Sequence, residues 1–373
     1  GKFEDYGIYT QVEQLNKTAL KSHGLDSNGQ LYKINSFEFY RYEDIIKKED
    51  DAGYDKTAFE KMLEIKGDSD HTKLIDMLTD LNDYSIGIED VLKEHFDEEN
   101  IVYWMAFQIL MGNVDTQNRN VYLYSPLNSD IWYFIAWDND GCLMRSEYEL
   151  KNFSDQGSWE KGISNYWGNV LFQRCLKSRS FREKLNDAIL ELREYLNKDM
   201  LISKIESYKN VLKPYLYSMP DAEYEPLTSE QYDQIVASLP DEIEKNYKLY
   251  LESLETPMPF YIGVPTIDGN KLKFNWDVSY DLDAEDITYS VEVARDYLFQ
   301  DVIYHNTTLT VPETEMDLPE AGQYFVRIRA TNTSGKTQDA FDYYVTDEGK
   351  HYGMKCFYIT EDSTVEEDNY EEG

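Results

Sequence analysis

The chain is poor in basic residues and cysteine, and it has no long hydrophobic run. Its 373 residues include 36 Lys and Arg against 72 Asp and Glu, so the formal net charge is -36. A surface this acidic repels phosphate backbones and anionic lipid headgroups, and we therefore expect no nucleic acid among its partners. No stretch of about 18 apolar residues occurs, so the sequence predicts no membrane-spanning segment.

The three cysteines, Cys142, Cys175 and Cys356, lie far apart in the sequence. They match neither a zinc-ligand spacing nor a disulfide framework, and we expect them to be buried apolar groups. Aromatic residues are abundant instead, at 14% of the chain with 32 tyrosines, which is typical of chains that build packed cores. The acidic, Tyr-rich composition suits a secreted or cell-surface bacterial protein.

The hydrophobic patterning predicts an α+β chain with a mainly helical first part and an all-β second part. Residues 1–255 are expected to form the first domain, and the proline-containing segment 256–259 begins a β-sandwich over 256–347. A short strand and an acidic tail are expected over 348–373. The predicted strands of the first domain are 6–13 and 31–34, and its predicted helices are 56–65, 70–81, 97–111 and several between 170 and 254.

One helix and one hairpin stand out in the first domain. Asp97, Glu98 and Glu99 place negative charge in a first helical turn, where it is favourable, and Gly112 provides the stop. The intervening residues are apolar nearly all round, which predicts a buried helix. Two strands at 121–124 and 131–137 then predict a β-hairpin.

Polar residues flank this hairpin at both of its ends. Asp115, Asn118 and Asn120 precede it, and Asp138 and Asp140 follow it. Paired strands lie about 5 Å apart, so we expect these groups to converge. Carboxylate and amide oxygens are hard ligands suited to Mg²⁺, Mn²⁺ or Ca²⁺. The alternative is ordinary turn chemistry, because Asp and Asn are common turn residues.

The spacing of these residues matches a phosphotransfer pattern. In protein kinases, a catalytic-loop Asp accepts the substrate proton, an Asn five residues later binds metal, and a later Asp binds Mg²⁺. Here Asp115 and Asn120 are five residues apart, and Asp138 follows Asp115 by 23 residues, across the hairpin.

Four segments resemble the CotH family of spore-coat protein H-like atypical kinases: 7–13, 31–33, 112–120 and 136–140. The resemblance implies a kinase-like fold that transfers the ATP γ-phosphate to Ser or Thr of proteins, with Mg²⁺ or Mn²⁺. It also implies a spore-coat location as an alternative to secretion or the cell surface. It assigns Asp115 as the catalytic residue, Asn120, Asp138 and Asp140 to the metal, and Glu13 and Lys33 to the nucleotide.

The resemblance assigns the strand ending near Glu13 as the hinge that contacts adenine. The family segment that normally precedes this hinge strand, with the lysine for the ATP phosphates, is expected to be missing, which predicts that this chain is inactive or incomplete as a kinase. Residues 258–347 resemble a fibronectin type III domain. Two other functions stay open. One is a non-catalytic kinase-like scaffold that binds a protein or a glycan at the cell surface, and the other is a metal-dependent phosphoesterase built on the same carboxylates.

Overall fold

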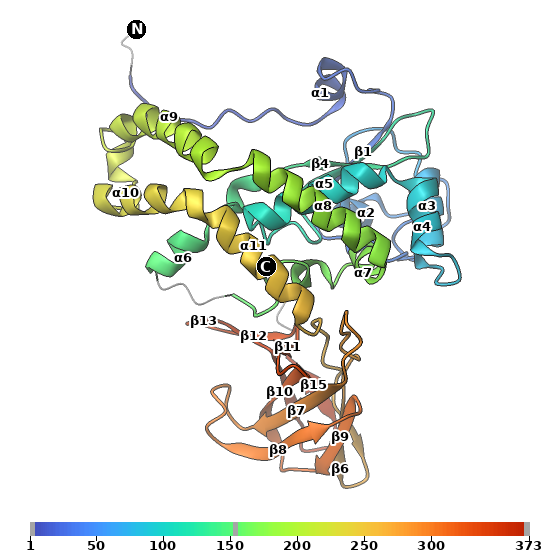
Figure 1. Cartoon of the computed structure of the whole chain (residues 1–373). Helices are drawn as coiled ribbons and strands as arrows, with labels where there is room; N and C mark the ends of the chain where they lie inside the picture. The colour runs from blue at the N-terminus through green and yellow to red at the C-terminus, as the bar shows by residue number, and fades with distance from the viewer. Residues whose placement is uncertain (1–3, 152–155, 369–373) are drawn as a thin grey trace. The chain divides into compact units, whose positions relative to one another are not determined.

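The computed structural model describes residues 4–151 and 156–368 (Figure 1). The chain has a mixed α+β structure, with helices dominating the first part and β-sheets the C-terminal part, as predicted. Its contacts divide it into two compact units, residues 1–152 with 169–248 and residues 153–168 with 249–373. No helix in the described ranges has the length and apolar character needed to cross a membrane.

The first unit contains a four-stranded antiparallel sheet with the order β2-β1-β3-β4. The predicted hairpin is confirmed and forms β3 and β4. The helix predicted over 56–65 ends earlier than expected, because Leu63 leaves it and pairs with Ile34 of β1. The bounds are β1 Gln30–Ile34, β2 Leu63–Ile65, β3 Val121–Ser125 and β4 Tyr133–Ala136.

The strand predicted over residues 6–13 does not form. Residues 4–15 have no regular secondary structure and are mostly exposed. A strand requires a partner whose backbone completes its hydrogen bonds, and here the backbone N–H of Ile8 donates instead to the Asp221 carboxylate, at 3.0 and 3.2 Å. Helix α1 (Lys17–Ser22) follows, with Asn16 as its N-cap.

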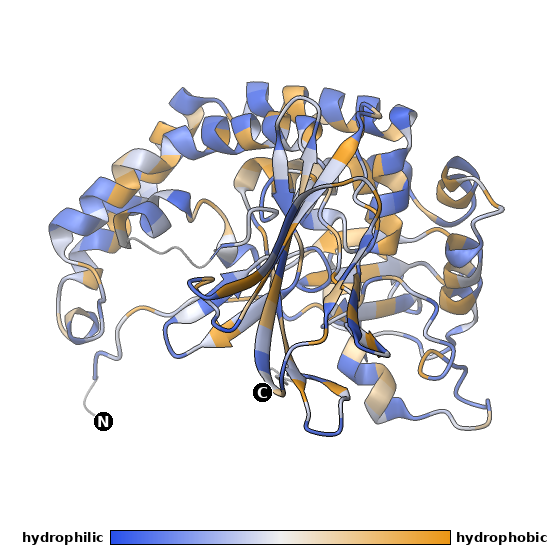
Figure 2. Cartoon of the chain, turned by 90° about the horizontal axis from the view of Figure 1, so that it is seen from below, coloured by the Kyte–Doolittle hydropathy of each residue, from blue (hydrophilic) through white to orange (hydrophobic). Residues whose placement is uncertain are grey.

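Helix α5 (Glu98–Met111) carries the chain to the predicted site. Asp97 begins it by accepting a hydrogen bond from the Asn100 N–H at 2.9 Å, and Gly112 ends it in the left-handed conformation, with φ of 65°. The Asn100 side chain also connects the helix to β4. Its Oδ1 accepts a hydrogen bond from the Phe134 N–H at 2.7 Å, and its Nδ2 donates one to the Phe134 carbonyl oxygen at 3.1 Å. Most helices mix hydrophobic and hydrophilic turns (Figure 2), but α5 is apolar nearly all round and buried, as predicted.

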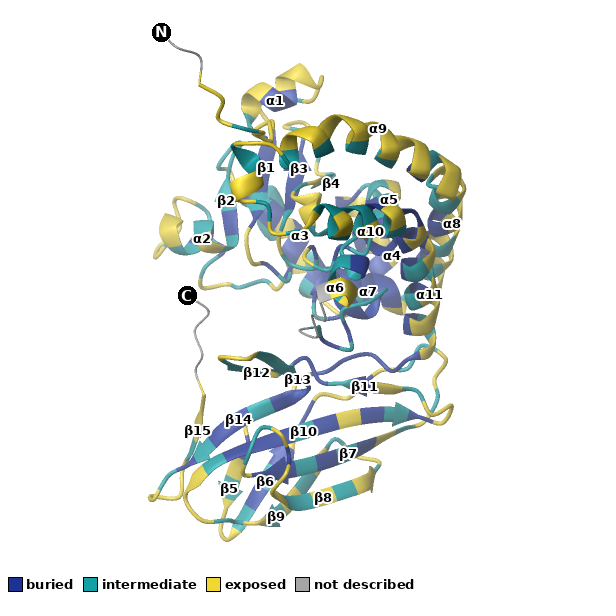
Figure 3. Cartoon of the chain, turned by 90° about the vertical axis from the view of Figure 1, so that its left-hand side faces the viewer, coloured by how far each residue is buried: buried dark blue, intermediate teal, exposed yellow. Residues whose placement is uncertain are grey.

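Helices α1, α4 and α6 were not predicted, whereas the helical region between residues 170 and 254 was. Helix α9 is largely exposed (Figure 3), with Leu201 as its buried residue. The remaining helices are α2 Lys56–Met62, α3 Thr72–Asn82, α4 Ile88–His95, α6 Arg145–Lys151, α7 Val170–Lys177, α8 Arg179–Tyr195, α9 Lys198–Leu216, α10 Ser229–Ser238 and α11 Glu242–Glu255. Four short 3-10 turns are η1 Asn139–Gly141, η2 Ser164–Tyr166, η3 Asp221–Glu223 and η4 Leu239–Asp241.

Arg174 in α7 is buried and holds together the chain between α3 and α4. Its guanidinium donates hydrogen bonds to the carbonyl oxygens of Leu81 and Ile86, and to that of Asp83 at 3.4 Å. Arg174→Ala leaves these carbonyls without their charged donor, so we expect it to lower the free energy of unfolding by about 3 kcal/mol. Urea unfolding measures the change.

Arg179→Ala is the matched control for this substitution. The Arg179 side chain is 86% exposed and pairs with Glu183 on the helix surface. Exposed pairs contribute little, so we expect a loss below about 0.5 kcal/mol. Equal losses for the two variants would contradict the structural role of Arg174.

The second unit is built from sheets with the orders β15-β14-β10-β7-β8 and β5-β6-β9, with β11 beside β10, and a separate β12-β13 pair. One core combines side chains of both larger sheets, such as Phe274 of β6 and Val291 of β7. The fibronectin type III assignment stays a prediction. The strands are β5 Thr266–Asp268, β6 Lys271–Asn275, β7 Ile287–Ala294, β8 Val302–Leu309, β9 Glu313–Asp317, β10 Gly322–Asn332, β11 Thr337–Asp339, β12 Tyr343–Thr346, β13 Gly349–Tyr352, β14 Met354–Ile359 and β15 Val365–Glu367.

The limits of the two units differ from the predicted limits at residues 255 and 347. The boundary between the units falls after residue 248, inside α11, and residues 153–168 group with the second unit. The segment predicted as a strand with an acidic tail contributes β14, which pairs with β10, and also β13 and β15. The end of the tail, 369–373, lies outside the described residues.

Candidate functional site

The loop between α5 and β3 holds the first group of predicted site residues. The Asn120 side-chain amide donates a hydrogen bond to Asp115 Oδ2 at 2.7 Å, so the predicted catalytic and metal residues are in direct contact. Asp115 also forms an ion pair with Arg119 at 3.3 Å, and both side chains are about half exposed, at 51% and 47%. Asn120 has a φ of 57°, a left-handed conformation that asparagine tolerates better than most residues.

The turn after β4 holds the second group. Val121 pairs with Ala136 in the hairpin. Asn120, just before β3, and Trp137, just after β4, therefore lie at the same end of the two strands. Asp138 and Asp140 are exposed, and Asp138 has a φ of 54°.

Two buried amides, those of Gln108 and Asn113, bond the exposed Asn139 of this turn. Asn139 Oδ1 accepts hydrogen bonds from the side chains of Gln108 (3.0 Å) and Asn113 (3.3 Å), which are themselves bonded at 3.1 Å. These three amides connect helix α5, the Asp115 loop and the Asp138 turn through neutral groups, so they hold the turn without neutralising its carboxylates.

The Asp115 carboxyl responds to the other acidic groups of the site. Burial raises its pKa, the Arg119 charge lowers it, and the carboxylates of Asp138 and Asp140 raise it again, with a smaller lowering from the Asn120 hydrogen bond. The net pKa of Asp115 lies above the ordinary 3.8. The Asp138 and Asp140 carboxylates therefore act electrostatically on the Asp115 carboxyl, although they are not its largest influence.

This raised pKa predicts a pH-dependent effect of Asp115→Asn on stability. The folded chain holds the Asp115 proton to higher pH than the unfolded chain, so its stability falls as pH rises from about 3.8 through the raised pKa. Asparagine cannot ionise, so we expect the metal-free variant to be more stable than wild type at pH 7. This gain should vanish below pH 3.8.

Urea titrations at a series of pH values measure the difference. The exposed Asp187 of α8 offers a control, because Asp187→Asn changes charge equally on the helix surface. A gain that stays the same at every pH would contradict the prediction for Asp115.

The residue types predicted to hold the metal are those that a hard divalent cation prefers. Asp138 and Asp140 provide carboxylate oxygens and Asn120 an amide oxygen, which is the chemistry that Mg²⁺ and Mn²⁺ prefer. Within the described ranges, no three His, Cys, Asp or Glu side chains are grouped closely enough to hold a metal ion. The predicted set therefore depends on Asn120 as a ligand beside the two aspartates.

The two predicted nucleotide residues have different positions. Lys33 lies on β1 and is paired with Tyr122 of β3, which follows Asn120 by two residues. Opposite residues of paired strands share a face, so the Lys33 and Tyr122 side chains lie on the same face of the sheet. The same face carries Trp137, whose ring meets that of Tyr122 edge-on at 5.3 Å. Glu13 lies in the irregular segment before α1, so the predicted hinge strand is wrong. The Glu13 carboxylate bonds the His23 side chain at 2.7 Å, and this contact lowers the pKa of Glu13.

Sequence reasoning missed several residues that shape this site. Gln108 and Asn139 had no assigned role, although a lone amide inside an apolar helix is a usable signal for Gln108. Asn118 was expected beside the carboxylates, but its side chain donates to Glu38 at 2.6 Å and its carbonyl accepts from Phe37 at 2.8 Å. Asn118 therefore anchors the loop to the segment after β1.

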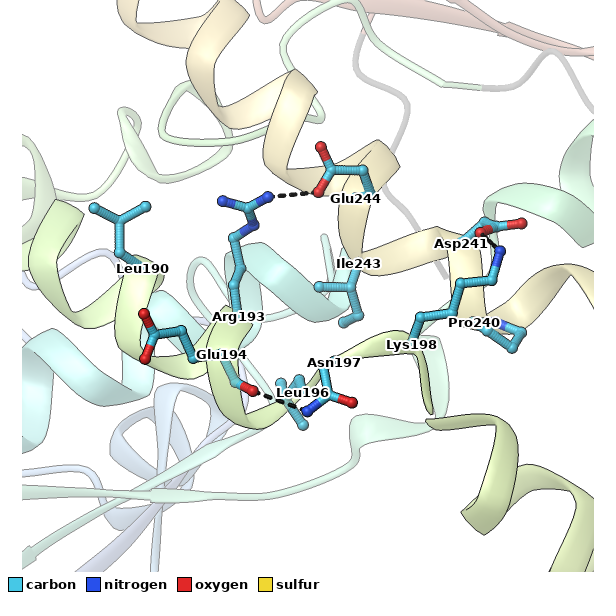
Figure 4. Close-up of a pocket in the computed structure, with 10 residues that line it drawn as sticks. All are labelled: Leu190, Arg193, Glu194, Leu196, Asn197, Lys198, Pro240, Asp241, Ile243 and Glu244. Atoms are coloured by element: carbon cyan, nitrogen blue, oxygen red, sulfur yellow. Dashed lines mark hydrogen bonds and ion pairs between the residues drawn. The ribbon is translucent and has the colours of Figure 1, made fainter. Parts of the chain in front are cut away.

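A separate surface pocket of about 550 Å³ lies beside α8, α9 and α11 (Figure 4). Its cations are paired in place, Arg193 with Glu244 at 2.6 Å and Lys198 with Asp241 at 2.5 Å. We assign no chemistry to this pocket. Its lining residues are Leu190, Arg193, Glu194, Leu196, Asn197, Lys198, Pro240, Asp241, Ile243 and Glu244.

Comparisons with known proteins place the chain in a family. A search of curated proteins returns no match. Among solved structures, the surface layer protein SbsC (domains 1–6) aligns at 12% identity with a TM-score of 0.15, over 88% of this chain and 41% of that one. The chain thus spans about two fifths of that structure, and a likeness this slight carries no argument. Residues 2–250, more than half of the chain, match the family model described as CotH kinase protein. The chain therefore belongs to the CotH kinase protein family.

Proposed function

We propose that the chain is a CotH-like protein kinase that transfers the γ-phosphate of ATP to Ser or Thr hydroxyls of a protein. The observation that carries this proposal is the 2.7 Å contact between Asp115 and Asn120 within one loop, at the end of the hairpin where the chain continues to Asp138 and Asp140. Phosphoryl transfer depends mainly on positioning and charge neutralisation, for which such a cluster is suited.

The proposed roles follow from the chemistry of each group. Asp115 accepts the hydroxyl proton, and a raised carboxyl pKa makes it a better base near neutral pH. Asn120, Asp138 and Asp140 would hold Mg²⁺ or Mn²⁺, which when bound neutralises charge on the phosphates. Lys33 is the proposed phosphate contact. Glu13 is left out of the proposed site because its carboxylate pairs with His23.

The test is phosphate transfer by the purified chain. With Mn²⁺ and γ-labelled ATP, we expect label on Ser or Thr of casein or of the chain itself, together with a higher melting temperature. Release of inorganic phosphate from a separate phosphoester substrate, without any transfer of label from ATP to protein, would favour a phosphoesterase. No label and no thermal shift would contradict the proposal.

A second candidate is a kinase-like scaffold without transfer activity. The ion pair between Arg119 and Asp115 favours this candidate. The Arg119 guanidinium, 3.3 Å from Asp115 Oδ1, engages the carboxylate that would otherwise accept the substrate proton. Thermal stabilisation by ATP and Mn²⁺ without any label transfer would support this candidate. Its ligand would be a protein or glycan.

The second unit suggests where the chain works. We propose that it is a fibronectin type III-like module, used as a spacer or binding domain in a secreted or surface protein, with the spore coat as the alternative location. Its two larger sheets share one apolar core, which is the packing such modules use. Detection of the protein in culture medium, on the cell surface or in spore coats tests the location.

A further inference from the structure

One face of helix α11 holds the segment that follows Asp138 and Asp140. Glu242, Lys245 and Asn246 occupy positions i, i+3 and i+4, which lie on the same side of a helix. Glu242 is fully buried and accepts the Ser146 N–H at 2.6 Å. Lys245 donates to Ser146 Oγ at 3.3 Å, and Asn246 Oδ1 accepts from Arg145 Nε at 2.6 Å. The start of α6 is therefore held by α11.

The same Asn246 side chain also contacts the end of α5, which leads to Asp115. Its amide donates to the Leu110 carbonyl oxygen at 3.0 Å. The last carbonyls of a helix lack intrahelical partners, and here that of Met111 is satisfied by Leu143 N–H at 2.8 Å. A Cβ added at Gly112 would lie 2.6 Å from the Asn246 amide nitrogen, so the left-handed turn packs directly on this side chain.

Asn246 thus joins both segments that carry the acidic site. Its Nδ2 donates a hydrogen bond to Leu110 of α5, the helix that leads into the Asp115 loop. Its Oδ1 accepts a hydrogen bond from Arg145, which follows the Asp138 turn. The side chain is 2% exposed, so water does not compete for either bond. An amide can make this bridge because it donates and accepts at once, whereas aspartate can only accept and alanine can do neither.

We propose that Asn246 is a positioning residue that sets the spacing between Asp115 and the Asp138–Asp140 turn. The inference rests on the proposed function for its chemical consequence, because phosphate transfer requires the base and the metal residues at a fixed separation. A misplacement of about 1 Å can cost about 100-fold in rate.

The test compares Asn246→Ala with Asn332→Ala, a matched control in the second unit. Asn332 is 4% exposed and its amide donates to the Glu255 carbonyl and to Asp281, both at 3.0 Å. We expect Asn246→Ala to lower kcat about tenfold or more with little change in the KM for ATP. We also expect faster amide hydrogen exchange in peptides covering 112–118 and 139–147. Asn332→Ala should change neither.

Asn246→Asp serves if the alanine variant does not fold. It keeps the acceptor for Arg145 and removes the donor to Leu110, so faster exchange should appear mainly in 112–118. Unchanged exchange at the site in the Asn246 variants would overturn the inference, even in an active kinase. An exchange effect with kcat equal to that of Asn332→Ala would also overturn it. A wild-type chain that transfers no phosphate would refute the proposed function, whereas the exchange measurement would still decide whether Asn246 bridges the two segments.

Discussion

Asp138→Asn should abolish phosphate transfer, with a loss of about 10³-fold or more in kcat, because it removes a full negative charge from the proposed metal site. The substitution is nearly isosteric. Asp138 has a φ of 54°, and asparagine adopts this left-handed conformation readily, so the turn should keep its shape. The variant therefore separates the loss of charge from a loss of fold.

Transfer of label from γ-labelled ATP gives kcat, and electron paramagnetic resonance of free Mn²⁺ gives the metal affinity. Both should fall in Asp138→Asn. Asp187→Asn makes the same change on the exposed surface of α8 and should leave both quantities at the wild-type level. Wild-type turnover and Mn²⁺ affinity in Asp138→Asn would exclude Asp138 as a metal residue.

Asp115→Asn should lower kcat by about 10²- to 10⁴-fold while Mn²⁺ and ATP still bind, because it removes the proposed proton acceptor and leaves Asp138 and Asp140 in place. Asparagine keeps an oxygen that can accept the Asn120 hydrogen bond, which measures 2.7 Å in the wild-type chain. The same variant is expected to gain stability at pH 7, because burial and the Asp138 and Asp140 carboxylates raise the pKa of Asp115 and so disfavour its charged form in the folded state.

The measurement pairs a transfer assay with thermal shifts in the presence of Mn²⁺ and ATP. Loss of turnover with retained ligand-induced stabilisation is the expected result. Loss of both would mean that Asp115 acts in binding, and unchanged turnover would remove Asp115 from the catalytic role. Arg119→Ala is the informative companion, because freeing Asp115 from its 3.3 Å ion pair should preserve or raise turnover.

Local signals predicted the elements that lead to the site. Helix α5 was expected from Asp97 at its start, Gly112 at its end and the apolar run between them, and the structure has all three features. The hairpin was expected from its two apolar strands and the turn between them. In both cases the deciding residues are neighbours in sequence, so the pattern contains the necessary information.

Elements that depend on distant partners were predicted less well. Residues 6–13 have the composition of a strand, but no neighbouring strand pairs with them, and Ile8 bonds Asp221 instead. Residues 63–65 were expected to continue a helix, but β1 offers a pairing edge and they join it. Helix α6 was missed, and its first residues are held by Glu242 and Asn246, about 100 positions away in the chain.

The sequence by itself determined the hairpin and its register, because antiparallel pairing brings Asn120, before one strand, to the same end as Trp137, after the other. The grouping of Asp115, Asn120, Asp138 and Asp140 was predicted on that ground and stays a prediction, apart from the contact between Asp115 and Asn120. Only the tertiary structure decided what holds them at their spacing. The buried amides of Gln108, Asn113 and Asn246 bond Asn139, Leu110 and Arg145 across segments distant in sequence, and no local pattern encodes such contacts.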